Sequence, residues 1–466
     1  MPHVVPAKIA LSFAVIAVCV AVWAELRAQE EAPAEQPAPP LESPAAAPEP
    51  PGEAGQAPAD AEVLVTPPPP PGGVPPPVLP EPPPTSAPEP APEAPEADIA
   101  GGVAGYFPGE GFAIKSADLQ FKLRMGLQVA YRLEPRWRDG ESLDRRTFFV
   151  ARPFLSGHIF EEWVRFWTSF EFASNPPFLL DSYVEIMPIS EFGVRIGQQY
   201  SPISRHEYFG PQEILFPEWA PVADYFWPGR DKGVTLLGSL GEGVVDYWLG
   251  IYSGTPLRQF TAIEGNWVAL ARVTVSPLGP GAANEAMYIT SEEPVPLRPS
   301  FTIQGYAGDV ELAIENFNPS TFRFDAEASG ESRQHLAGSA DIWLQGPRFT
   351  ALVEGYVRRT DPSGASPAFT SIGVWGQVGY MLVDRILDLG VRVNWLDAST
   401  DLSNDRLYSV EGQLGYYPFS TQTLVLKLRY AYGRQNSPGE DALGSVPLVA
   451  PEGKYHIATA QLGLAF

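Results

Sequence analysis

Residues 119–133 constrain the fold more than any other part of the chain, because their side chains alternate between two chemical kinds. One face carries Leu, Phe, Met, Val and Tyr, and the other carries Gln, Lys, Arg, Gly and Ala. This period of two predicts one extended strand. It is longer than the roughly 9–11 residues that a tilted strand needs to cross a bilayer. A long hairpin strand of a soluble sandwich is the alternative.

The last residues of the chain repeat this alternation. Ala458, Ala460, Leu462, Leu464 and Phe466 share one face of the final strand. A terminal aromatic residue that closes an amphipathic strand is similar to the terminal signal of bacterial outer-membrane barrels. Together with the strand at residues 119–133, it favours a closed barrel over a soluble sandwich.

The first residues are typical of a secretory leader. Residues 1–24 place His3 and Lys8 before an apolar run, and a small residue, Ala24, stands at the expected cleavage site. Cleavage after Ala28 is an alternative, and so is an uncleaved anchor helix. Cys19 is the single cysteine, and Val18 is too large for a lipoprotein cleavage site. A mature chain without cysteine excludes disulfides and thiol catalysis.

Residues 29–98 form a second region of distinct composition. They hold 25 of the 52 prolines, mixed with alanine and glutamate. This composition cannot bury a core and predicts a disordered or polyproline-like linker. In the periplasm the linker would act as a semi-rigid spacer. Contact with the cell wall or with a periplasmic partner is the alternative.

The remaining residues, 111–466, predict an all-β region of sixteen antiparallel strands joined by alternating short turns and long loops. The strands are expected at residues 119–133, 145–159, 163–173, 180–187, 192–200, 233–239, 243–253, 266–276, 300–307, 335–344, 348–359, 369–382, 386–396, 406–417, 422–433 and 455–466. Closure is physically required, because an open sheet edge in lipid would leave backbone groups unpaired. Residues 277–299 break the rule, since a periplasmic turn is expected there and the segment is too long for one.

Several short motifs identify a resemblance. They are GF at residues 111–112, VRIGQ at 194–198, PGRDKGV at 228–234, WGQVGY at 375–380 and LDLGVR at 387–392. With them the chain resembles the phosphate-selective porin O/P family of bacterial outer membranes, over residues 111–466. The resemblance implies a sixteen-stranded channel, commonly a homotrimer in outer-membrane lipid, that passes small anions such as phosphate.

Strand parity predicts which basic side chains enter the lumen. The expected pore-lining bases are Lys122, Arg124, Arg132, Arg152, Arg165, Arg195, Arg272, Arg392, Lys427 and Arg429. Closure places the last strands beside the first, which predicts one anion path along Lys122, Arg124, Arg165, Lys427 and Arg429. Arginine suits this role because its planar fork binds phosphate or carboxylate with two hydrogen bonds. Arg–Glu pairing that merely fills a wet interior is the alternative.

The expected pore-lining acids complete the lumen. They are Glu171, Asp181, Glu185, Asp246, Asp341, Glu354, Asp388 and Glu411. A cationic wall that faces an anionic wall would tune which ions pass.

The loop at residues 201–232 is rich in aromatic residues, which predicts that it packs on other residues. It is expected to fold into the lumen, and covering a neighbouring subunit is the alternative.

No signature of an enzyme, a metal site or a cofactor site stands in the sequence. It has no phosphate-cradling Gly loop, no HExxH motif and no paired cysteines. Its 55 acidic residues outnumber 31 lysines and arginines, which argues against nucleic-acid binding. The sequence therefore predicts a non-enzymatic outer-membrane porin for small anions. A barrel that anchors the Pro-rich arm to the cell wall or to a periplasmic partner is the second hypothesis.

Overall fold

A computed structural model describes most of the region that was predicted to be a barrel. The predicted leader and nearly all of the predicted Pro-rich linker lie outside the described residues. The described residues are 97–99, 102–107, 111–138, 141–174, 177–206, 209–210, 212–255, 266–318, 323–362, 367–402, 405–436 and 453–465. Among them, no helix is both long and apolar enough to span a membrane.

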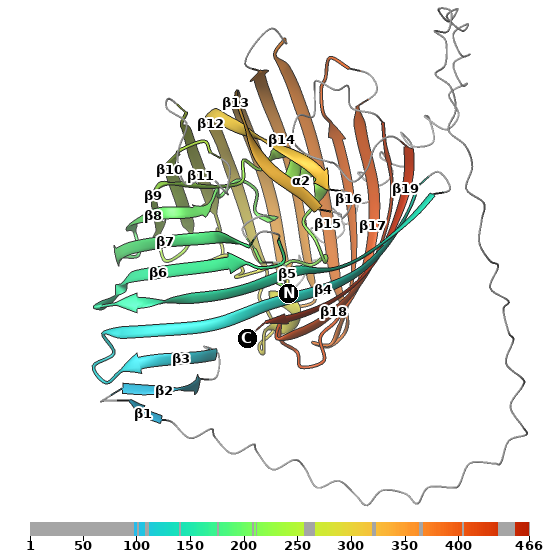
Figure 1. Cartoon of the computed structure of the whole chain (residues 1–466). Coiled ribbons are helices and arrows are strands. Elements are labelled where there is room, and N and C mark those ends of the chain that lie inside the picture. The colour runs from blue at the N-terminus through green and yellow to red at the C-terminus, as the bar shows by residue number, and fades with distance from the viewer. Residues whose placement is uncertain are drawn as a thin grey trace, which may run out of the picture. The chain divides into compact units, whose positions relative to one another are not determined.

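Sixteen strands, β4 to β19, follow one another around an antiparallel barrel, and each pairs with the next along the chain (Figure 1). Their bounds are β4 Phe121–Arg138, β5 Glu141–Ile159, β6 Glu161–Glu171, β7 Phe178–Ile189, β8 Phe192–Tyr200, β9 Arg230–Leu240, β10 Val245–Tyr252, β11 Val268–Val275, β12 Arg298–Asn318, β13 Arg323–Gly346, β14 Phe349–Pro362, β15 Phe369–Val383, β16 Leu387–Asp397, β17 Arg406–Tyr416, β18 Leu424–Gln435 and β19 Gly453–Ala465. Each predicted strand overlaps one of these, so the prediction of sixteen strands is confirmed.

The barrel closes between its last and first strands. β19 pairs with β4 from Tyr455 opposite Arg138 to Ala465 opposite Gln128. Closure matters because an unpaired strand edge exposes backbone N–H and C=O groups that water or another chain must satisfy. The predicted closed antiparallel barrel is therefore confirmed as well.

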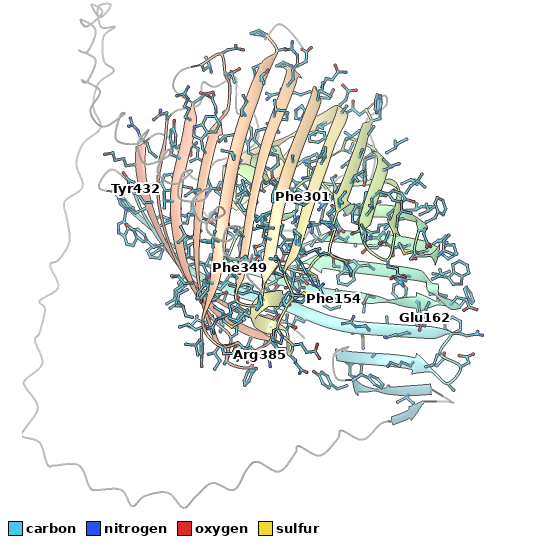
Figure 2. All side chains as sticks on the ribbon, turned by 180° about the vertical axis from the view of Figure 1, so that it is seen from behind. Phe154, Glu162, Phe301, Phe349, Arg385 and Tyr432 are labelled. Atoms are coloured by element: carbon cyan, nitrogen blue, oxygen red, sulfur yellow. The ribbon has the colours of Figure 1, made fainter. Side chains whose placement is uncertain are left out.

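Alternation along the strands separates an apolar outer face from a polar lumen. In β4, Tyr131 and Leu133 are exposed on the outside, whereas Arg132 between them is 2% exposed. Phe301 is another exposed aromatic side chain on the barrel wall (Figure 2). The outer face carries leucine, isoleucine, valine and phenylalanine on most strands. Such a surface suits contact with lipid tails rather than with water.

Three short strands that the sequence did not predict precede the barrel: β1 (Ala97–Ile99), β2 (Gly102–Phe107) and β3 (Gly111–Ser116). They form an antiparallel meander beside β4 (Figure 1). β3 pairs with β4 between Lys122 and Met125, whereas β19 pairs with the same strand from Gln128 onward. The meander therefore covers the part of the β4 edge that β19 does not reach.

The long loop between β8 and β9, residues 201–229, contains the short helix α2 (Pro221–Phe226) and folds into the lumen. Ile214 and Phe226 of this loop pack in one apolar cluster with Trp343, Trp375 and Leu396 of the wall. Trp343 and Trp375 are each 1% exposed. The prediction that this loop folds inward is confirmed.

The connection between β11 and β12, residues 276–297, also folds inward. It contains helix α3 (Met287–Thr290), whose Tyr288 and Ile289 are buried. This connection is longer than a short periplasmic turn because part of it lies inside the lumen. β11 and β12 are still neighbours in the barrel, as the sequence predicts. Most of the other connections at this end are short, such as the turn that contains Arg385 (Figure 2).

Candidate solute path

Three arginines converge on the inward loop at Glu218. Arg132 Nη1 donates to Glu218 Oε2 at 2.8 Å, and Arg429 binds the other carboxylate oxygen. Arg392 Nη1 donates to the backbone carbonyl of Glu218 at 2.9 Å. Burial alone would raise the pKa of Glu218, but the charges of Arg429 and Arg132 outweigh it and hold that pKa well below its usual value. The loop is thus held by charge-assisted contacts with β4, β16 and β18.

Two further bases bind backbone carbonyls of the same loop. Lys427 Nζ donates to Ile214 O at 2.5 Å and to Phe216 O at 3.4 Å. Arg272 Nη1 donates to Pro202 O at 3.2 Å. Lys427 and Arg429 enter the lumen, as their parity predicts, but both are at most 5% exposed beneath the loop. The structure therefore separates them from Lys122, Arg124 and Arg165, with which the sequence analysis placed them in one anion path.

The acids of this side of the barrel are engaged in the same way. Asp341 accepts from Arg205 of the loop at 2.9 Å, and Glu354 accepts from Ser204 at 2.9 Å. Glu411 lies between two bases, and its Oε2 accepts from Arg392 at 2.7 Å and from Arg429 at 2.6 Å. Asp341 and Glu354 thus hold the loop directly, and Glu411 orients the two arginines that bind it.

The loop and the inward turn meet inside the barrel. Leu215 N donates to Glu285 Oε2 at 2.8 Å, and Ala286 N donates to Glu213 O at 3.2 Å. In α3, Tyr288 donates from its hydroxyl to Asp388 at 2.7 Å. The loop and the turn together fill the lumen beside β13 to β18.

Two cavities lie on the other side of the lumen, against β4 to β9. The larger, about 430 Å³, is lined by Lys122, Arg124, Ser156, Gly157, His158, Glu162, Arg165, Phe166, Trp167, Tyr183, Glu185 and Arg195. The smaller, about 200 Å³, is lined by Gln128, Arg152, Phe154, Trp167, Ser169, Leu180, Asp181, Tyr183, Tyr200, Phe209, Gly210, Glu213 and Arg230. Glu162 lies nearer the rim of the barrel than Phe154 does (Figure 2). We name these the rim cavity and the inner cavity.

Six residues on six neighbouring strands stand directly opposite one another, and five of them, all but Lys115, line the rim cavity. This cationic row consists of Lys115, Lys122, His158, Arg165, Glu185 and Arg195, on β3 to β8 in that order. Directly opposite Cβ atoms lie about 4.5–5.5 Å apart, so these charges act on each other. Four of the six are lysine or arginine, and Glu185 is the single acid among them. Glu185 accepts from Arg195 Nη2 at 2.6 Å and lies 3.9 Å from Arg165.

The inner cavity carries charges of both signs. Arg152 Nε donates to Glu171 at 2.7 Å, and Arg230 Nε donates to Asp181 at 2.9 Å. Glu213 reaches this cavity from the loop, and its Oε2 accepts from Gly210 N at 2.8 Å. Burial raises the pKa of Glu213, an effect that the bond from Gly210 opposes.

The predicted site residues therefore divide into two groups. Those on the open side are Lys122, Arg124, Arg152, Arg165, Glu171, Asp181, Glu185 and Arg195. Those that hold the loop and the turn are Arg132, Arg272, Asp341, Glu354, Asp388, Arg392, Glu411, Lys427 and Arg429. Asp246 on β10 is half-buried and lines neither cavity.

Several residues of the open side were not predicted from the sequence. Lys115 was missed because β3 was not predicted, and Arg230 because it was placed in the loop rather than at the start of β9. Trp167 was treated as one more aromatic residue of a strand. Its parity, shared with Arg165 on β6, was the signal that could have placed it in the lumen.

Comparisons with known proteins bear on the fold. The anion-selective porin from Comamonas acidovorans matches with a TM-score of 0.52 and 10% identity, over 74% of this chain and 99% of that chain. OmpT, an outer membrane protein of Vibrio cholerae folded in vitro and in its trimer form, matches with a TM-score of 0.49 and 9% identity, over 74% of this chain and 99% of that chain. The outer membrane channel DcaP of Acinetobacter baumannii matches at 0.45 and 14% identity, over 76% and 99%. No protein-family model and no curated protein matches the chain. At 10% identity, the likeness to the Comamonas porin supports the barrel fold alone.

Proposed function

We propose that this protein is a porin of the bacterial outer membrane, through which small anions diffuse passively. The observation that carries the proposal is the cationic row across the rim cavity, on the side of the lumen that the loop leaves open. Rings or walls of basic side chains favour anions in a pore. The barrel fold, shared with a porin that is itself described as anion-selective, supports the same conclusion.

The short turns and the rim cavity lie at one end of the barrel, which would face the periplasm. Anions that leave the inner cavity would then meet Lys122, Arg124 and Arg165 before they reach the periplasm. Guanidinium and ammonium groups bind phosphate and carboxylate oxygens through charge-assisted hydrogen bonds. Phosphate, which the resemblance implies, is therefore one anion that we expect to pass.

Single-channel recording of the purified full-length protein in a planar bilayer tests this proposal. We expect discrete conductance steps in KCl, and we expect added phosphate to reduce the chloride current. The double variant Lys122→Gln and Arg165→Gln should weaken the effect of phosphate. Arg359→Gln, which changes an exposed arginine on β14, is the matched control and should behave as wild type. An absence of conductance steps in the wild type would overturn the proposal.

We further propose that the protein assembles as a homotrimer, as the resemblance to phosphate-selective porins implies. Three barrels would then conduct in parallel within one particle. Native mass spectrometry of the detergent-solubilised protein measures the mass of the assembly directly. A mass of one chain would contradict the proposed trimer and would leave the proposed channel intact.

A further inference from the structure

Three aromatic side chains lie between the two cavities of the open side. Phe154 on β5 stacks on Trp167 on β6, with ring centroids 4.8 Å apart and an interplanar angle of 11°. Trp167 stands directly opposite Tyr183 on β7. Trp167 and Tyr183 line both the rim cavity and the inner cavity. A solute that moves from one cavity to the other along this wall therefore passes these rings, which we name the aromatic strip.

The aromatic strip is more exposed than the two inward-facing tryptophans on the filled side of the lumen. Trp343 and Trp375, on β13 and β15, are each 1% exposed because the loop packs on them. Phe154, Trp167 and Tyr183 are only half-buried. The fold thus leaves flat apolar rings exposed to the solute path. Exposing apolar surface to water is unfavourable, and such exposed surfaces often mark binding sites.

Guanidinium groups stand on both sides of the aromatic strip. Arg195 of the rim cavity lies over the Tyr183 ring, 4.5 Å from its centroid. In the inner cavity, Arg152 and Arg230 each bind a carboxylate through Nε. Among the described residues, the Nη atoms of Arg152 and Arg230 have no hydrogen-bond acceptor. These atoms can bind a further carboxylate in the planar geometry that arginine favours.

From this arrangement we propose that the open side of the lumen has a subsite for aromatic carboxylates of about the size of benzoate. The ring of the solute would lie against the aromatic strip. Its carboxylate would bind Arg195 when the solute is in the rim cavity, and Arg152 and Arg230 when it is in the inner cavity. Aromatic rings favour offset-stacked or edge-to-face contacts with one another. The inner cavity of about 200 Å³ has room for one ring, since a cavity of roughly 150 Å³ binds benzene.

This inference rests on the proposed channel function, and one bilayer experiment separates the two. Benzoate and cyclohexanecarboxylate carry the same charge and have similar size, but only benzoate is aromatic. Each is titrated into KCl while the chloride current of the wild-type full-length protein is recorded. We expect the half-blocking concentration of benzoate to be about two- to tenfold lower, because an aromatic pair adds affinity beyond the area that it buries.

Two variants locate the effect. Trp167→Leu removes the central ring and should abolish the difference between benzoate and cyclohexanecarboxylate. Phe170→Leu changes an exposed aromatic residue on the outer face of the same strand and should keep the difference. Equal block of the wild type by the two acids would overturn the aromatic subsite and leave the proposed channel standing. A wild type without conductance would overturn the proposed function itself.

Discussion

At the scale of single residues, Glu218 is the point at which the inward loop is attached to the barrel. Its carboxylate binds Arg132 and Arg429, and its backbone carbonyl binds Arg392. Without the Glu218 carboxylate, Arg429 would keep its bond to Glu411 and Arg132 would keep Glu134 at 3.5 Å, but the loop would lose its charge-assisted hydrogen bonds to β4 and β18. The width of the open side therefore depends on this residue, although it lines neither cavity.

Replacing Glu218 with alanine should loosen the loop and enlarge the pore. We expect a higher and noisier single-channel conductance, and a free energy of unfolding that is lower by about 1.5–3 kcal/mol, the usual contribution of a hydrogen bond to a charged group. Denaturant titration in detergent and bilayer recording measure the two effects. Asp224→Ala is the matched control, since Asp224 is an acid of the same loop whose carboxylate, among the described residues, binds no arginine or lysine. A Glu218→Ala channel with wild-type conductance would contradict the role of Glu218 as an anchor.

Glu213 should make ion preference depend on pH. Burial raises its pKa, so it takes up a proton at a higher pH than a free carboxyl group. Below that pKa the inner cavity, which Arg152 and Arg230 also line, loses one negative charge. We therefore expect anion preference to increase as the pH falls through the raised pKa of Glu213, as measured by reversal potentials.

The Glu213→Gln variant tests this pH dependence, because glutamine cannot ionise. It should show at pH 7 the anion preference that the wild type reaches only in acid, with little further change on acidification. An unchanged pH profile in Glu213→Gln would assign the effect to another group, such as Asp224 of the same loop, since burial raises the pKa of Asp224 to about 6.

At the scale of elements, β4 has two different partners along one edge. β19 pairs with it from Gln128 to Arg138, and β3 pairs with it from Lys122 to Met125. The three-stranded meander therefore acts as an extension of the barrel wall. It also brings Lys115 to the end of the cationic row, opposite Lys122.

Two deletions separate the meander from the Pro-rich segment. Removing residues 29–96 should leave the melting temperature of the barrel and its conductance unchanged. Removing residues 29–116 should lower the melting temperature, because the Lys122–Met125 part of β4 then keeps β5 on one edge but loses β3 on the other. Heat-induced unfolding in detergent, followed by circular dichroism, measures both. Equal melting temperatures for the two deletions would show that β3 does not support the barrel.

At the scale of the whole molecule, the strands were predictable because apolar and polar side chains alternate along each of them, and this alternation is local in the sequence. The same alternation predicts that Arg132, Arg392 and Glu411 point inward, and in the structure all three are buried. Parity could not show which part of the lumen is filled, since this depends on contacts between segments far apart in the sequence. Lys427 bonds to Ile214 and Arg429 to Glu218, over 200 positions away. The open side, and with it the solute path, could therefore be found only from the structure.

The net charge of the whole chain does not indicate the charge of the surface that lines its lumen. The chain has a formal charge of −24, yet the part of the cationic row that lines the rim cavity holds three bases, Lys122, Arg165 and Arg195, and one acid, Glu185. Many of the acids lie in residues 29–98, which contain 13 acidic residues and neither lysine nor arginine. What passes a pore depends on the charges that face its lumen. The role of residues 29–98, including contact with the cell wall, stays a prediction that the deletion of residues 29–96 can test in cells.

The reversal potential under a KCl gradient tests the central claim most directly, because its sign reports whether chloride or potassium crosses more easily. For the wild-type protein we predict an anion-selective potential. Arg165→Glu should shift it toward cation selectivity, and Arg359→Glu, on the outer face of β14, should not. A cation-selective wild type, or equal shifts in the two variants, would contradict an anion path along β4 to β8.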